Sequence, residues 1–297
     1  MENIILMNNS ISKKDITRSI LYINIAVLLY GTSGVMSRFT EVSSSVLTFG
    51  RVFVSTCVLL IYSLIVKKDL KLKNKRDFII LMAAGAVLGF HFLTFFVSIR
   101  LSTVAIATIT YAAAPLFMVF LDHFVYGAKL TKKSLIMTIL IIIGVSITCP
   151  DISFENSMFM GLLIGLLSAF LYGILTVLNN EVASEYDSTT VTLYQQAAAS
   201  LTTLPFAFIT FNGLNAADIA VIGFIGVVIT AVAFAMFVST QRYLSVQTVG
   251  IVSTMETVYG IILAAVFLYE IPSSGELIGG LIVLSVVIYA QLDIQKN

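Results

Sequence analysis

Ten runs of apolar residues follow one another along the chain, separated by short polar connections. Each run has about the length, roughly 20 residues, with which a helix crosses ~30 Å of hydrocarbon. The runs are continuous, whereas a barrel strand would need only about ten residues of alternating character. Because a helix pairs its own backbone N–H and C=O groups inside a bilayer, we predict an all-α polytopic membrane protein with ten transmembrane helices. The runs cover 19–39, 46–66, 77–98, 102–123, 133–149, 157–179, 188–210, 216–238, 245–268 and 274–292.

The composition supports a membrane setting. Of the 297 residues, 58% are hydrophobic and 11% charged, and the mean hydropathy is +1.00. A soluble domain would carry about a quarter charged residues. The net charge of +1 comes from short basic clusters between apolar runs, so it gives no indication of nucleic-acid binding.

The motifs of several other function classes are missing from the sequence. Cys57 lies inside an apolar run and Cys149 at the end of another, which favours neither a disulfide nor a zinc cluster. No glycine-rich phosphate-binding loop is present, so ATP-driven pumping by this chain alone is not expected. We therefore expect no metal and no cofactor.

The basic residues predict the orientation. The stretch from Ser19 to Arg38 is long enough to span and lacks a clear cleavage site, so we read it as the first span rather than a signal peptide. With a cytoplasmic N-terminus, 14 of the 17 Lys and Arg residues fall on the cytoplasmic side and three on the other. The positive-inside rule then predicts a multi-pass protein of the inner or plasma membrane with both termini in the cytoplasm.

A shift of 142 residues aligns the two halves of the chain. Leu-Tyr-Gly at 29–31 then meets Leu-Tyr-Gly at 171–173, Arg100 meets Arg242, and Leu135 meets Leu277. We predict two five-helix repeats, at 19–149 and 157–292. Since each has an odd number of spans, the second must enter the membrane from the opposite side, an arrangement typical of alternating-access carriers.

Charged residues within the spans are costly and therefore informative. Glu256 lies about midway along the ninth run, where an acidic group costs roughly 2.5–3.5 kcal/mol. We consider it the candidate for proton coupling; the alternative is a structural hydrogen bond to a neighbouring helix. Its repeat partner is Ala114, so the carboxyl belongs to one half only.

Two further titratable residues allow two interpretations each, and a proline is the third candidate. Arg51 could bind a substrate carboxylate or extend its side chain to the interface. His91 could titrate near neutral pH or serve as a buried hydrogen-bond donor. Pro115 interrupts the backbone hydrogen bonds of the fourth run and could expose carbonyl groups to a cavity.

Small and polar residues at helical spacing form stripes on several runs. Such stripes indicate either close helix packing or the wall of a polar cavity. From them we take the substrate-binding candidates Tyr30, Ser33, Arg51, His91, Thr94, Tyr111, Tyr172, Thr176, Gln195, Ser253 and Glu256.

Several short motifs resemble the EamA-type ten-helix carriers of the drug/metabolite transporter superfamily. Leu-Leu-Tyr-Gly-Thr-Ser at 28–33 is similar to the first-helix pattern of that family, with Tyr30 where Trp is commoner. Ala-Pro-Leu-Phe at 114–117, followed by Gly127, resembles the fourth-helix signature. Glu-Thr-Val-Tyr at 256–259 and Leu-Tyr-Glu at 268–270 resemble the Glu-Pro-Val and Gly-Glu elements of the ninth helix and the connection after it.

The chain departs from this pattern at two places. Thr257 replaces a proline, which leaves a kink in the ninth helix open, and Ala128-Lys129 replaces the first Gly-Glu. The resemblance covers essentially the whole chain. It implies two EamA repeats, cytoplasmic termini, a central cavity and export of amino acids or related metabolites, although some members import vitamins or other nutrients.

These observations together predict a secondary transporter, proton-coupled or facilitative, that moves a small metabolite by alternating access, with export favoured. An uptake permease for a vitamin-like or nucleoside-like solute is the first alternative. A membrane-embedded enzyme ranks lower because the sequence offers no cluster of polar groups near one interface. The expected partners are a small-molecule substrate and the lipid bilayer, without nucleic acid; the oligomeric state stays open, and a monomer is compatible with the sequence.

Overall fold

The computed structural model describes residues 13–127, 130–149, 151–182, 185–240, 243–244 and 246–294. Within these residues the regular elements are helices, which confirms the all-α expectation. Their bounds are α2 Lys13–Met36, η2 Ser37–Phe39, α3 Ser44–Ile65, α4 Lys75–Leu101, α5 Val104–Tyr111, α6 Ala114–Tyr126, α7 Lys132–Thr148, α8 Ser157–Asn180, α9 Ser188–Ile209, α10 Ala216–Phe224, η3 Ile225–Ala233, α11 Phe234–Thr240, α12 Val246–Phe267 and α13 Ser274–Ile294.

Each expected span falls on a helix or on consecutive helical pieces. The fourth span is divided into α5 and α6, and the eighth consists of α10, a π-helical stretch η3 and α11. In the described part of the chain, six segments are long and apolar enough to cross a membrane, and shorter apolar stretches lie in α12 and α13. The helix α12 runs as one uninterrupted α-helix through Thr257, the position where the family motif has a proline.

Polar residues at the helix starts explain where many elements begin. The first N–H groups of a helix have no partner within it, and a side-chain oxygen just before the helix can accept from them. Ser43, Asn74, Thr103 and Asp187 do this for α3, α4, α5 and α9. At α10, Asn215 and Asp218 form a reciprocal capping box.

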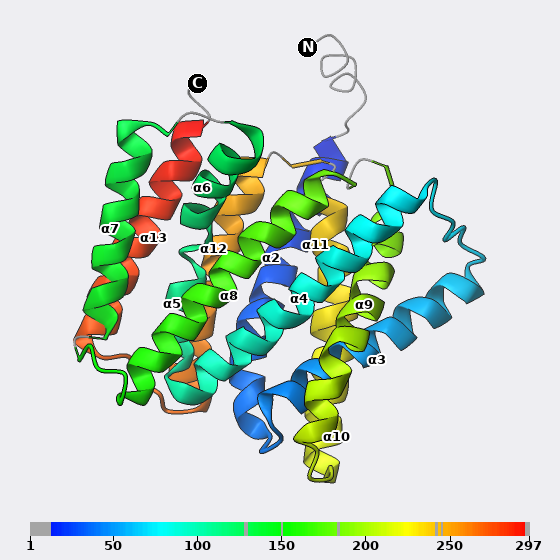
Figure 1. Ribbon diagram of the computed structural model, residues 1–297, viewed down its shortest axis with the longest axis horizontal. Helices are drawn as coiled ribbons and strands as arrows, with labels where there is room; N and C mark the ends of the chain where they lie inside the picture. The colour runs from blue at the N-terminus through cyan, green and yellow to red at the C-terminus, as the bar shows by residue number, and fades with distance from the viewer. Residues whose placement is uncertain are drawn as a thin grey trace.

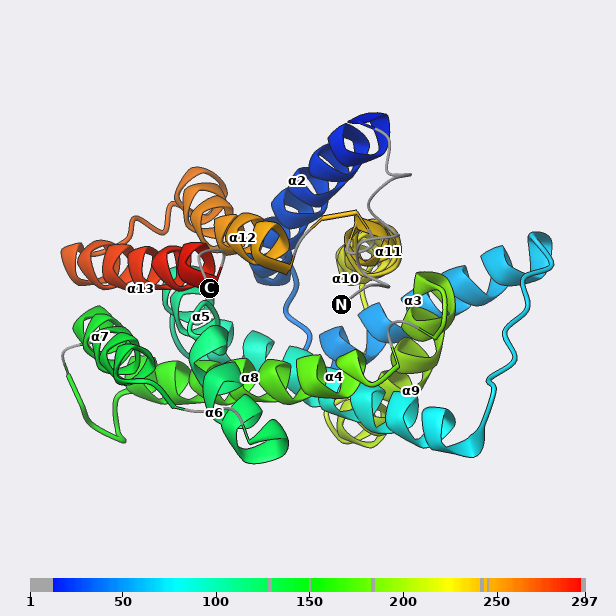
Figure 2. The same cartoon turned by 90° about the horizontal axis from the view of Figure 1, so that it is seen from above.

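The helices surround the middle of the molecule in two rows (Figure 1). Seen from above, α13, α12 and α2 follow one side, whereas α7, α8, α4 and α9 follow the other (Figure 2). Figure 1 also shows that α2 begins and α13 ends at the same end of the bundle. We call this the terminal end; the distal end is the opposite one, where η2 and the start of α5 lie.

Glycines permit the closest helix contacts. A Cβ atom at Gly85 of α4 would lie 2.4 Å from the carbonyl oxygen of Gln195 on α9, and one at Gly279 of α13 would lie 2.3 Å from that of Gly144 on α7. Side chains larger than hydrogen do not fit at such distances. Small residues therefore set the spacing of these helix pairs, as is usual in membranes.

Candidate functional site

A small cavity of about 70 Å³ lies in the middle of the helix bundle. Its wall comes from α2, α3, α4, α5, α8, η3, α11 and α12, so both halves of the chain contribute. The lining residues are Tyr30, Ser33, Arg51, Leu88, His91, Phe92, Phe95, Tyr111, Tyr172, Ile229, Thr230, Phe234, Phe237 and Glu256.

Arg51 contributes a buried positive charge to the cavity wall, with 4% of its surface exposed. Its Nε donates to Thr230 Oγ1 at 2.9 Å and its Nη1 to Ser33 Oγ at 3.4 Å. The guanidinium carbon lies 4.0 Å from the ring centre of Phe92, a cation–π contact. None of the ion pairs found among the described residues involves Arg51. A planar donor group held in this way suits a carboxylate ligand.

A π-helix positions the main hydrogen-bond partner of Arg51. Over Ile225–Ala233 the helix is wound more loosely than an α-helix, and Thr230 Oγ1 donates to the Ile225 carbonyl five residues earlier, at 2.8 Å. The same oxygen therefore accepts from Arg51 and donates to the backbone. Such π-segments are rare and frequently lie at functional sites.

His91 links α4 to α8 at the cavity. Its Nδ1 lies 3.0 Å from the Ser168 carbonyl oxygen and 2.9 Å from Ser168 Oγ, which in turn donates to the His91 carbonyl at 3.0 Å. A carbonyl oxygen only accepts, so we place a proton on Nδ1. In the neutral imidazole, Nε2 is then the acceptor, and the hydrogen bonds to Ser168 fix the ring orientation.

Aromatic rings form much of the remaining wall. The Tyr111 and Tyr172 ring centres lie 5.2 Å apart in an edge-to-face arrangement, and His91 lies 5.4 Å from Tyr172. Across α2 and α11, Tyr30 and Phe237 are 5.7 Å apart. The Tyr30 hydroxyl is buried and has no hydrogen-bond partner among the described residues. The wall thus combines apolar ring faces with a few polar groups, as is typical of ligand sites.

Glu256 adds a carboxyl group to the cavity from α12. No hydrogen bond or ion pair to this carboxyl is found among the described contacts. The next residue, Thr257, is buried and donates to the Thr108 carbonyl at 3.1 Å, which holds α12 against α5. On the other side, the close approach of Gly31 to the Glu256 carbonyl holds α12 against α2. The backbone on which Glu256 stands is therefore fixed from two directions.

The break between α5 and α6 lies just before Pro115. Ala112 and Ala113 form a turn there, with Ala113 N donating to the Thr110 carbonyl at 3.1 Å. Because Pro115 has no N–H, the Tyr111 carbonyl lacks its usual partner four residues later. This unpaired carbonyl belongs to Tyr111, one of the residues that line the cavity.

Seven of the eleven sequence candidates line the cavity: Tyr30, Ser33, Arg51, His91, Tyr111, Tyr172 and Glu256. The structure places the other four outside its lining. Three of them donate to carbonyls of their own helix: Thr94 to Phe90 and His91, Thr176 to Tyr172, and Ser253 to Val249. Gln195 is fully buried and donates to Asn179 Oδ1 on α8 at 2.5 Å.

Sequence reasoning did not identify Thr230 or the phenylalanines of the wall. A phenylalanine in an apolar run looks the same whether it faces lipid or a cavity, so no sequence signal separates the two. Thr230 is a single hydroxyl in an otherwise apolar run, and such a residue more often donates to its own backbone. In the structure, Thr230 lies in the π-helical segment and accepts from Arg51.

Comparison with known proteins agrees with this architecture. The model of the EamA-like transporter family matches residues 17–149 and again 159–290. An uncharacterized transporter, YxxF, of Bacillus subtilis (strain 168) is 25% identical over 87% of this chain and 84% of its own length. An uncharacterized transporter of Archaeoglobus fulgidus is 27% identical over 68% of this chain and 73% of its own.

One solved crystal structure superposes with a TM-score of 0.67 at 17% identity, over 94% of this chain and 98% of that one, which shows a shared fold. The family and the relatives' names point to a transporter rather than an enzyme, in agreement with the multi-pass helical fold and its central cavity. Two successive matches to one family model cover most of the sequence, and the chain therefore belongs to the EamA-like transporter family.

Proposed function

We propose that this protein carries a small amino acid or a related zwitterionic metabolite across the plasma membrane by alternating access, with the central cavity as its binding site. The observation that carries this proposal is a pair of ionisable groups of opposite sign, Arg51 on α3 and Glu256 on α12, that line one cavity with no ion pair between them among the described contacts. A substrate with both a carboxylate and an ammonium group would give each charge a partner.

The rest of the wall fits such a ligand. Buried charges are costly when unpaired, so a ligand that neutralises both gains more than one that meets only one of them. The faces of Tyr111, Tyr172 and Phe92 offer an apolar or aromatic surface for the remainder of the substrate. Since the family resemblance implies export of amino acids, we favour export.

The proposed orientation follows from the distribution of basic residues. Lys68, Lys73 and Arg76 lie in or next to the connection between α3 and α4, on the terminal side of the bundle. By the positive-inside rule this side faces the cytoplasm. The distal end then faces outward, and the cavity lies between the two.

Counterflow in proteoliposomes tests the function directly. Vesicles that contain the purified protein and are preloaded with one unlabelled solute are given the same labelled solute outside, over a panel of amino acids and vitamins. We expect saturable exchange of at least one amino acid and none in protein-free vesicles. Exchange of vitamins alone would favour the uptake permease, and no exchange of any compound in the panel would contradict the proposal.

The variant Arg51→Gln tests the binding role in the same assay. The amide keeps a hydrogen-bond donor but removes the charge, so we expect the affinity for carboxylate substrates to fall roughly 10- to 100-fold, since a hydrogen bond to a charged group contributes about 1.5–3 kcal/mol. The affinity of the corresponding amide analogues, measured by competition, should change little. An equal loss for both would mean that Arg51 does not bind the carboxylate.

A further inference from the structure

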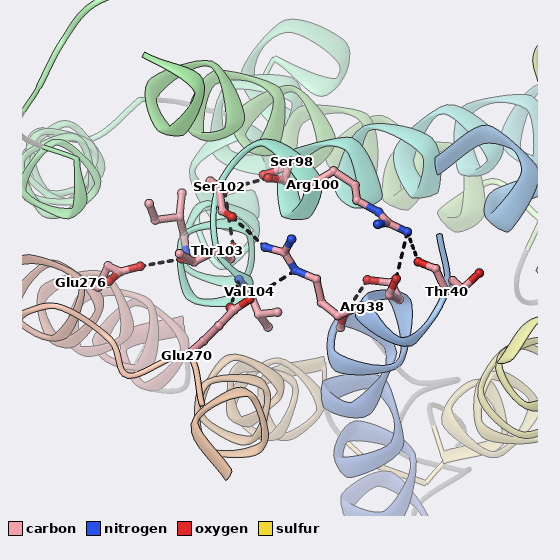
Figure 3. Close-up of polar contacts among 12 residues, drawn as sticks. Arg38, Thr40, Ser98, Arg100, Ser102, Thr103, Val104, Glu270 and Glu276 are labelled. Carbon is pink, nitrogen blue, oxygen red and sulfur yellow. Dashed lines mark hydrogen bonds and ion pairs between the residues drawn. The ribbon is translucent and has the colours of Figure 1, made fainter. Parts of the chain in front are cut away.

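The distal end of the bundle is closed by a polar network centred on Glu270, in the connection between α12 and α13 (Figure 3). Glu270 Oε1 lies 3.3 Å from Arg38 Nε, and Glu270 Oε2 accepts from the Val104 backbone N–H at 3.1 Å. The Arg38 Nη2 donates to the Ser102 carbonyl at 2.8 Å. One carboxylate and one guanidinium therefore connect η2, the first turn of α5 and the α12–α13 connection.

A second carboxylate holds the same two chain segments together. Thr103 Oγ1 donates to Glu276 Oε1 at 2.5 Å, and the Ser273 N–H donates to Glu276 Oε2 at 2.7 Å. Thr103 also caps α5. Two carboxylates, Glu270 and Glu276, therefore connect the α4–α5 junction of the first half to the α12–α13 region of the second half.

Arg100 extends the network to the connection between α2 and α3. Its Nη2 donates to the Thr40 carbonyl at 2.5 Å and to the carbonyls of Ser37 and Val42 at 3.2 Å (Figure 3). Thr40 in turn donates to Asp218 of α10. Elements from both halves therefore meet in one continuous set of contacts at this end.

Apolar packing closes the same end between the network and the cavity. One core cluster joins Val35 of α2, Phe96 and Ile99 of α4, and Ala264 of α12, so it crosses from one row of helices to the other. The cluster at the terminal end of α2 instead joins it to α11 and α12. The terminal end of α4 packs on α8 and α9. Among the described clusters, none joins α2 and α12 to α4 at the terminal end.

The internal repeat supplies independent support. With the 142-residue shift, Arg38 aligns with Asn180 and Glu270 aligns with Ala128. The position equivalent to Thr103 is Ser245, and that of Glu276 is Ser134. Arg38, Glu270 and Glu276 therefore have no charged counterpart in the other half, whereas Arg100 aligns with Arg242.

We propose that the contacts of Glu270 with Arg38 and Val104, which we call the distal latch, are the gate that keeps the outer side closed and favours the state in which the cavity faces the cytoplasm. This inference rests on the alternating-access function proposed above. Opening to the outside must separate the α4–α5 junction, with Ser102 and Val104, from Arg38 and Glu270 on the side of α2 and α12, and this exposes both charges further to water. Because the ion pairs described at the other end join neighbouring helices on one side of the bundle, weakening the latch shifts the population toward the outward-facing state.

Accessibility of a cavity cysteine tests the latch. In a background with Cys57→Ala and Cys149→Ala, Ser33→Cys is labelled with a membrane-impermeant maleimide, from outside in spheroplasts and from the cytoplasmic side in inverted vesicles. With the latch intact, we expect fast labelling in inverted vesicles and slow labelling from outside. Glu270→Gln and Arg38→Gln should each raise the rate of labelling from outside by at least about fivefold. The double variant should be labelled from outside at nearly the same rate as the single variants, because the two residues form one interaction.

Glu185→Gln is the matched control, because it removes a carboxylate from an ion pair with Lys73 at the terminal end. It should leave the outside rate unchanged. Unchanged outside labelling in both Glu270→Gln and Arg38→Gln, with the protein inserted at normal levels, would overturn the inference; if one variant fails to insert, the other decides. Since labelling needs no substrate, failure of counterflow with a normal labelling response would contradict the transport proposal and not the latch.

Discussion

At the scale of single residues, the main feature of the cavity is that Arg51 has no ion-pair partner among the described residues. Burying a charge in an apolar medium is costly unless it is paired and hydrogen-bonded. Arg51 recovers part of this cost from Thr230, Ser33 and the Phe92 ring, all of which are neutral. The charge of Arg51 is therefore stabilised but not neutralised by these contacts. An anionic ligand would neutralise it and so gain binding free energy.

Glu256 leads to a prediction about coupling. Glu256→Gln keeps the size of the side chain but replaces one carboxyl oxygen by an NH2 group, so it can neither carry a charge nor exchange a proton. We expect this variant to lose transport driven by a pH gradient, while counterflow at saturating substrate, which needs no net proton movement, is retained with a lower affinity for the substrate. Uptake into or efflux from proteoliposomes, with and without an imposed gradient, measures the difference.

The control for this prediction is Glu276→Gln, which changes a carboxyl outside the cavity at the distal end. It should keep the proton dependence. Transport by Glu256→Gln with the proton dependence of the unmodified protein would remove Glu256 from the coupling step.

The cost of burying charge also explains which site residues could be predicted from the sequence. Arg51, His91 and Glu256 stand out in apolar runs, and all three line the cavity. Thr94 and Thr176 carried the same kind of signal, yet a hydroxyl can be satisfied by the backbone of its own helix, as the structure shows for both. Hydroxyl stripes therefore point to a cavity less reliably than charges do.

At the scale of elements, the ten apolar runs located the helices to within a few residues, because length and polarity determine what a bilayer accepts. The π-helix Ile225–Ala233 could not be predicted in this way. Whether the backbone hydrogen bonds span four residues, as in an α-helix, or five, as in a π-helix, depends on the tertiary contacts of the segment. Here Gly226 packs against Val54 and the Arg51 backbone, so the neighbouring helix α3 takes part in setting the register.

The pair formed by α7 and α13 gives a prediction at this scale. Gly279→Ala would place a Cβ 2.3 Å from the Gly144 carbonyl oxygen and 2.6 Å from Thr148 Cγ2. Both neighbours belong to a packed helix, so α13 must move away. We expect a destabilisation of about 1–3 kcal/mol and a midpoint of thermal unfolding lower by roughly 2–10 °C.

Thermal unfolding of a fluorescent fusion in detergent, followed by size-exclusion chromatography, measures the shift. Gly223→Ala on α10 is the matched control, since nothing lies within 4 Å of its added methyl group. Equal midpoints for the two variants would show that the α7–α13 contact is looser than described.

At the scale of the whole molecule, ion pairs join the loops at the terminal end. Lys68 lies 2.5 Å from Asp187, Lys73 pairs with Glu185, and Arg76 lies 2.5 Å from Glu181. The three pairs connect the α3–α4 region to the α8–α9 region, and so the first half to the second. Burial alone would raise the pKa of Asp187, but the hydrogen bonds from Lys68, Thr190 and Thr189 outweigh it and keep the pKa below its ordinary value.

The two ends of the molecule are therefore held differently. At the terminal end the ion pairs join α4 to α8 and α9, which already pack together in one row. At the distal end the hydrogen bonds of Arg38 with Ser102 and of Arg100 with Thr40, together with the apolar cluster, cross from one row to the other. A carrier with this distribution keeps its rows intact while one end opens, which is what rocking of two bodies about a central site requires.

The orientation of these ends is the last prediction. Lys71→Cys and Lys132→Cys lie on exposed connections at the terminal end, and Glu41→Cys and Asn212→Cys on exposed connections at the distal end. In the cysteine-free background, an impermeant maleimide should label the first two only in inverted vesicles and the last two only in spheroplasts, because in the proposed orientation the basic terminal end faces the cytoplasm. A reversed pattern for all four would invert the orientation and make the distal latch a cytoplasmic gate. Labelling of Lys71→Cys and Lys132→Cys from opposite sides would be more serious, since two connections separated by an even number of spans must share a face.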